Sequence, residues 1–109
     1  MDISATNNDK DLDLRVTVLL SAQRALLGAI TPNVRGVTVA YNNQQLTLRA
    51  YYDKDPLEEE KELLDFALGE MVADFYPSIE KYLFEPQVLP YPMKMAMLSD
   101  WVYVRHEVY

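Results

Sequence analysis

The sequence predicts a single α+β domain in which two helices pack on one face of a four-stranded, mainly antiparallel sheet, in the order α-β-β-α-β-β. Two segments show the apolar spacing of a helix, and two neighbouring segments alternate like the strands of a hairpin. The chain has 109 residues, half of them hydrophobic, which suits one domain with one core. We expect the polar residues 1–10 to form a flexible leader and residues 11–109 to form the domain.

The first helix is predicted over residues 12–30. Thr31 and Pro32 set its end, because a residue before proline is pushed out of helical geometry. Gln23 lies at the centre of the apolar stripe, where a buried amide needs hydrogen-bond partners, so we interpret it as a structural residue. The predicted stripe consists of Leu12, Val16, Leu19, Leu20, Leu26, Leu27 and Ile30. A second apolar row indicates that this helix could be covered on more than one side: Leu14, Val18, Ala22, Ala25 and Ala29.

Residues 34–41 and 46–52 are predicted to form two antiparallel strands, because apolar and polar side chains alternate along them. The residues between them include two asparagines, which tolerate the backbone of a tight turn. Two more strands are predicted over residues 79–85 and 101–109, with a loop or short arm over residues 86–99. One face of the sheet is expected to lie open and to show either the alternate set of side chains or Arg35, Thr47, Arg49 and Tyr51.

The second helix is predicted over residues 56–74. Asp55 is the expected N-cap, Pro56 fits the first helical position, and Glu58 follows three residues after the cap. Apolar side chains then recur at helical spacing and predict a buried stripe of Leu57, Leu64, Leu68, Met71 and Phe75.

The acidic charge is concentrated in one third of the chain. Residues 53–85 carry eleven acidic and three basic side chains, a formal charge of −8, whereas the whole chain carries −7. Such a surface attracts basic partners and repels nucleic acid and anionic membranes. No stretch approaches the roughly 20 apolar residues of a membrane helix, and the absence of cysteine suits a reducing cytoplasm. We therefore expect a cytoplasmic protein with a protein partner, and no binding to nucleic acid or membrane.

The residue types do not predict catalysis. One histidine and no cysteine exclude the usual zinc-type ligand sets, and His106 near the C-terminus is interpreted as a surface residue. Binding of Ca²⁺ or Mg²⁺ by carboxylates alone stays open, but the acidic segment lacks the spacing of an EF-hand loop. The glycines, Gly28, Gly36 and Gly69, form no phosphate-binding loop. We expect no enzyme activity, no catalytic residue, no cofactor and no metal.

The acidic second helix is the predicted partner-binding site. On a helical wheel Glu58, Glu62 and Asp65 share one side, away from the apolar stripe, and Phe66 falls among the acids. An apolar ring set among charges is typical of a binding hot spot. Two alternatives stay open: Phe66 tucks under a loop, or the charges form a solvated helix start. The predicted site consists of Asp53, Asp55, Glu58, Glu59, Glu62, Asp65 and Phe66.

Three segments carry a resemblance to a known group of proteins: residues 19–28 (LLSAQRALLG), 31–35 (TPNVR) and 101–105 (WVYVR). From residue 15 onward the chain resembles small bacterial immunity proteins of contact-dependent growth inhibition systems. The resemblance implies a non-enzymatic protein that binds a cognate toxin domain, frequently a basic nuclease, and blocks its active site. It transfers no site residues. The alternative is an interaction or structural subunit of a larger bacterial assembly.

Overall fold

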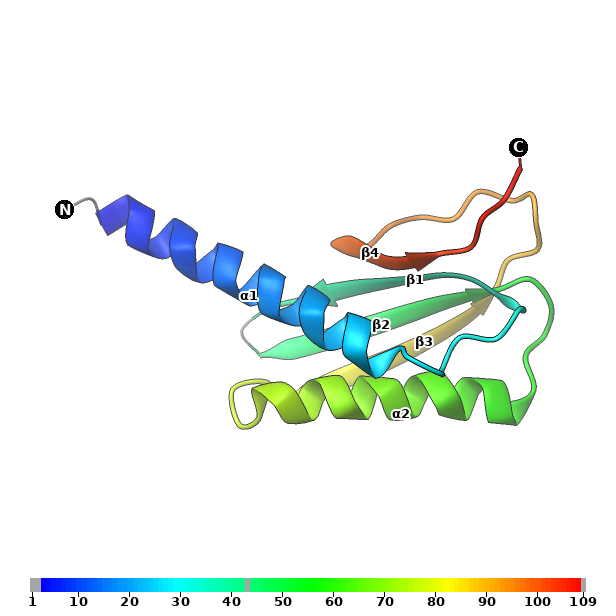
Figure 1. Cartoon of the computed structure of the whole chain (residues 1–109), viewed down its shortest axis with the longest axis horizontal. Coiled ribbons are helices and arrows are strands. Elements are labelled where there is room, and N and C mark those ends of the chain that lie inside the picture. The colour runs from blue at the N-terminus through cyan, green and yellow to red at the C-terminus, as the bar shows by residue number, and fades with distance from the viewer. Residues whose placement is uncertain (1–2, 43, 109) are drawn as a thin grey trace.

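A computed structural model describes residues 3–42 and 44–108, with side chains described from Asp13 onward. It contains two helices and one four-stranded sheet, and both helices lie on the same side of the sheet (Figure 1). The α+β class is confirmed. The elements are α1 (Ile3–Ala25), β1 (Val34–Tyr41), β2 (Gln45–Tyr52), α2 (Glu58–Phe75), β3 (Lys81–Val88) and β4 (Asp100–Val104).

The sheet is mixed, so the prediction of a mainly antiparallel sheet is wrong. Its strand order is β3-β2-β1-β4, and β1 is antiparallel to both β2 and β4, but β2 and β3 run parallel. The physical reason is the connection: α2 runs back across the sheet, so β3 starts at the same end of the sheet as β2. The strands β3 and β4 therefore lie at opposite edges.

The predicted hairpin is confirmed by the antiparallel pairing of β1 with β2. Its turn is held by the side-chain oxygen of Asn42, which accepts the backbone N–H groups of Gln44 and Gln45 at 2.7 and 2.8 Å. At the edge, β3 continues through Pro86 to Val88, beyond the predicted end. An edge strand tolerates proline because one side of its backbone needs no partner.

The first helix differs from its prediction at both ends. The helical backbone begins at Ile3, inside the segment expected to be a leader, and residues 1–2 lie outside the described residues. The helix ends at Ala25 instead of Ile30. A turn follows, in which Gly28 adopts a φ of +78°, a backbone conformation that glycine reaches without a steric penalty. This glycine, three residues before the Thr31-Pro32 pair, therefore stops the helix.

The predicted buried stripe of the first helix is wrong in part. Leu26 is buried and Ile30 packs against the core, but both follow the end of α1, and the side chain of Leu12 lies outside the described residues. Val16, Leu20 and Leu27 are 44%, 61% and 79% exposed, whereas Val18 and Ala22 are fully buried. The second apolar row faces the core, because small alanine side chains let α1 approach its neighbours closely. Gln23, expected to be buried, is exposed on the outer side.

The second helix starts two residues later than predicted, and Asp55 is not its cap. Leu57 is the N-cap, and its N–H donates to the carboxylate of Glu60 at 3.1 Å. The same carboxylate accepts a 2.5 Å hydrogen bond from the Thr31 hydroxyl, which connects the helix start to the turn before β1. Leu57, predicted to be buried, precedes the first helical residue, so the helical spacing of the stripe does not extend to it, and it is 67% exposed.

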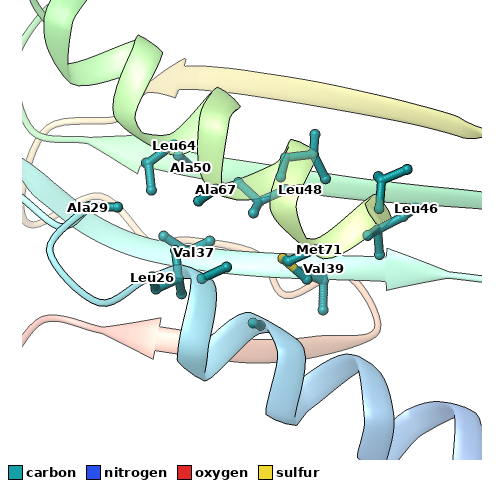
Figure 2. Packing of buried hydrophobic residues seen from close by; sticks show 14 of the residues in the cluster. Leu26, Ala29, Val37, Val39, Leu46, Leu48, Ala50, Leu64, Ala67 and Met71 are labelled. Atoms are coloured by element: carbon teal, nitrogen blue, oxygen red, sulfur yellow. The ribbon is translucent and has the colours of Figure 1, made fainter. Parts of the chain in front are cut away.

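The core lies between the helices and the sheet, and the rest of the α2 stripe is confirmed: Leu64, Leu68 and Met71 are fully buried, and Phe75 packs at the margin. Figure 2 shows that side chains from the turn after α1, from both hairpin strands and from α2 converge there: Leu26, Ala29, Val37, Val39, Leu46, Leu48, Ala50, Leu64, Ala67 and Met71.

The second face of the sheet is covered, which corrects the prediction of an open face. Residues 89–99 fold across it: the Tyr51 hydroxyl donates to the carbonyl of Ala96 at 2.8 Å, and the Thr38 hydroxyl accepts the N–H of Leu98. Gly36 allows this close approach, because a Cβ there would lie 3.0 Å from Sδ of Met95. The first face of the sheet is covered by the helices, and the exposed side of α2 carries acidic side chains.

Candidate partner-binding site

The solvent side of α2 presents acidic groups around one aromatic ring. We define the acidic face as Phe66 together with the exposed acids Glu59, Glu62, Asp65 and Glu70. Phe66 is 72% exposed, so it does not tuck under a loop. None of the four acids forms an ion pair with any other residue that the structure describes. Their charges are therefore available to a partner.

The other predicted members have different surroundings. Glu58 pairs with Lys61 at 2.7 Å, one turn along the same helix. Asp53 accepts the N–H of Tyr91 at 2.8 Å and pairs with Arg105 at 3.1 Å. The Tyr91 N–H and then Arg105 hold the pKa of Asp53 below its ordinary value. Asp53 therefore serves the fold, by fixing the segment after β3 and the end of β4.

Two separate hollows divide the predicted site. Asp53 and Asp55 line one of about 430 Å³ at the start of α2, together with Lys54 and Arg105. A second hollow of about 580 Å³ lies along the helix and is lined by Glu62, Asp65, Phe66, Gly69, Glu70 and Ala73. The predicted residues that line the same hollow as Phe66 are thus Glu62 and Asp65. In the first hollow, Lys54 and Arg105 weaken the negative potential.

A comparison with protein families identifies the chain. The family model described as MafI2 immunity protein matches residues 15–107. The chain belongs to the MafI2 immunity protein family. No curated protein sequence matches it. The resemblance to bacterial immunity proteins of a toxin system is thereby confirmed. The matched range includes every residue of the acidic face and excludes residues 1–14 and 108–109.

In this MafI2 family member the sequence pattern missed three residues of the surface. Leu63 is 41% exposed one turn before Phe66, and Gly69 and Ala73 are among the residues that line the larger hollow. A signal for Gly69 and Ala73 was present: residues 62, 66 and 70 form one row at a spacing of four, and residues 65, 69 and 73 form the next row. The second row lacks side-chain bulk at two of its three positions.

The other surface features of this MafI2 protein do not form a second acidic site for a basic partner among the described residues. Within the described ranges, no group of three His, Asp or Glu side chains is placed to hold a metal ion. No described helix is long and apolar enough to cross a membrane. His106 is exposed in the C-terminal segment. A hollow of about 400 Å³ on the far side of the sheet is mainly apolar and contains one charged side chain, Lys94.

Proposed function

We propose that this chain is a cytoplasmic, non-enzymatic immunity protein that neutralises a cognate toxin of a contact-dependent growth inhibition system by binding it through the acidic face. Membership of the MafI2 immunity protein family supports a toxin partner. The observation that carries the choice of surface is the exposed ring of Phe66 among four acids that have no ion-pair partner among the described residues. A partner that binds there is basic, as a nuclease domain with an anion-binding active site is.

The physical case rests on two separable contributions. Exposed carboxylates steer a basic partner during encounter, and this contribution is screened by salt over about 8–10 Å. Phe66 and Leu63 supply apolar area that a partner can desolvate, and such contacts act mainly on the dissociation rate. An inhibitor of this kind needs no catalytic group, because covering the active site of the toxin is sufficient.

Binding kinetics against the toxin domain encoded by the neighbouring gene test the proposal. The double variant Glu62→Lys/Asp65→Lys is expected to slow association by about tenfold at low salt and to flatten its salt dependence, because steering is lost. The matched control, Asp13→Lys/Glu80→Lys, changes the net charge equally at exposed positions outside the acidic face. If the two variants associate equally fast, the acidic face is only a solvated surface.

Protection of cells tests the biological part of the proposal. Cells that express the toxin domain are expected to survive when they also express the wild-type chain, and to survive less well with the Glu62→Lys/Asp65→Lys variant. Loss of protection by the control variant alone would place the toxin contact elsewhere.

The alternative role, an interaction subunit of a larger bacterial assembly, is favoured by the exposed apolar side chains of Val16 and Leu20 on α1 and of Leu27 in the turn after it. This role predicts that Leu20→Lys abolishes assembly and leaves toxin binding unchanged. Light scattering of the purified chain, with and without toxin, separates the two roles.

A further inference from the structure

One of the residues that line the hollow beside Phe66 is a glycine at an interior position of α2. Gly69 is poorly suited to a helix interior, where alanine is more favourable. No packing requires it, because a Cβ built at Gly69 meets no atom within 4 Å. The Gly28 backbone needs glycine and the Gly36 contact leaves no room for a Cβ, whereas Gly69 faces open space. The fold therefore does not explain this glycine, but a ligand that needs the space does.

The shape and chemistry of the hollow indicate what fits it. It is lined by the small residues Gly69 and Ala73, by the exposed ring of Phe66, and by the acidic residues Glu62, Asp65 and Glu70. A long side chain that lies over Gly69 places its stem against the ring and its end among the carboxylates. A cation is favoured twice there, by the negative face of the aromatic ring and by the acids.

We propose that Gly69 opens a slot for an arginine side chain of the toxin, which stacks on Phe66 and reaches the carboxylates of Glu62 and Glu70. This inference rests on the proposed function and adds the residue type that the site selects. Arginine suits the slot better than lysine, because its guanidinium is planar, stacks on aromatic rings and donates to two carboxylate oxygens at once. Gly69 is thus a specificity-determining residue, which acts through the space that it leaves.

Variants that fill the slot test the inference when their binding to the toxin domain of the neighbouring gene is measured. We expect Gly69→Ala to weaken binding about threefold and Gly69→Leu more than tenfold, mainly through faster dissociation. Both variants should unfold at a temperature no lower than that of the wild type, because glycine is the poorest ordinary residue in a helix interior. Gln23→Leu, which adds the same side chain to the exposed side of α1, is the control and should bind as the wild type does.

A double-mutant cycle identifies the partner side chain. One toxin arginine is expected to show coupling: its alanine variant weakens binding to the wild-type chain about tenfold and leaves binding to the Gly69→Leu variant almost unchanged. Phe66→Leu, which keeps apolar bulk without the ring, should remove most of the same coupling.

The outcomes separate this inference from the proposed function. If Gly69→Leu binds like the wild type while Glu62→Lys/Asp65→Lys associates slowly, the slot is empty in the complex and only the proposed function stands. If no toxin arginine shows coupling to Gly69 in the double-mutant cycle, the inference of an arginine slot is also overturned. If the wild-type chain does not bind the toxin at all, both proposals fail together.

Discussion

Arg35 is the charged residue whose replacement should destabilise the fold most, because its ion pair with Glu107 is buried. It sits in β1 with its side chain 0% exposed, and the carboxylate of Glu107, 3% exposed, accepts two of its N–H groups at 2.8 and 2.9 Å. Another nitrogen donates to the carbonyls of Leu89 and Met93 at 2.6 and 2.9 Å. One guanidinium therefore ties β1 to the segment after β3 and to the C-terminal segment.

The expected cost of Arg35→Ala follows from these contacts. Removing one partner of a buried ion pair costs about 3–5 kcal/mol, because the other charge is left buried. The lower end, about 3 kcal/mol, is expected here, because Arg105 still contacts Glu107 at 2.9 Å. For a domain with about 5–15 kcal/mol of total stability this is a large loss, and it lowers the melting temperature by about 10–20 °C.

Urea denaturation of Arg35→Ala and Arg24→Ala, followed by circular dichroism, measures the difference. Arg24 pairs with Asp74, but its side chain is 68% exposed, so its loss should cost below about 1 kcal/mol. The double variant Arg35→Met/Glu107→Leu should recover part of the lost stability, since no unpaired charge remains buried. The reasoning is refuted if Arg35→Ala costs no more than Arg24→Ala.

Three further predictions concern a core leucine, a buried tyrosine hydroxyl and the pH dependence of stability. Leu68→Ala should cost about 2–5 kcal/mol in urea denaturation, because a fully buried leucine leaves a cavity; a cost below that of Arg24→Ala would contradict the packing. Tyr52→Phe should be neutral or stabilising by up to about 1 kcal/mol, because the buried Tyr52 hydroxyl lacks a hydrogen-bond partner among the described residues and burial raises its pKa to about 12; marked destabilisation would reveal a partner. The pKa of Asp53 lies below its ordinary value of 3.8 in the folded state, so its stabilisation is complete above that value and is lost as pH falls through the lowered one. Asp53→Asn should therefore show a shallower loss of stability between pH 5 and pH 2 than the wild type, and equal slopes would exclude this role.

Local sequence patterns predicted those helices and strands for which the pattern allows only one buried face or one pairing. The α2 stripe through Leu64 and Leu68 was predictable because polar residues occupy the other side of that helix. The hairpin was predictable because two alternating segments flank a short turn. The parallel pairing of β3 also has a local cause, the α2 crossover, and could have been predicted from the order strand, helix, strand.

Long-range contacts decided the rest. The α1 helix is apolar on two sides, and periodicity cannot show whether Val18 or Leu20 meets the core; the close approach permitted by Ala22 decides it. In the site, the wheel placed Phe66 among acids correctly. It could not show that Asp53 pairs with Arg105, which lies 52 residues away along the chain. Gly69 was missed because its signal is the lack of side-chain bulk in the row of residues 65, 69 and 73, which a search for apolar periodicity does not detect.

The crossover geometry of α2 has a consequence for how a ligand meets this protein. The helix is joined at both ends to neighbouring strands of one sheet, β2 before it and β3 after it (Figure 1). Its inner face is fixed by fully buried side chains, Leu64, Leu68 and Met71. A surface mounted in this way has little conformational freedom left to lose, so a partner spends little of its binding free energy on ordering it. Rigid docking with small backbone shifts is the expected mode of capture.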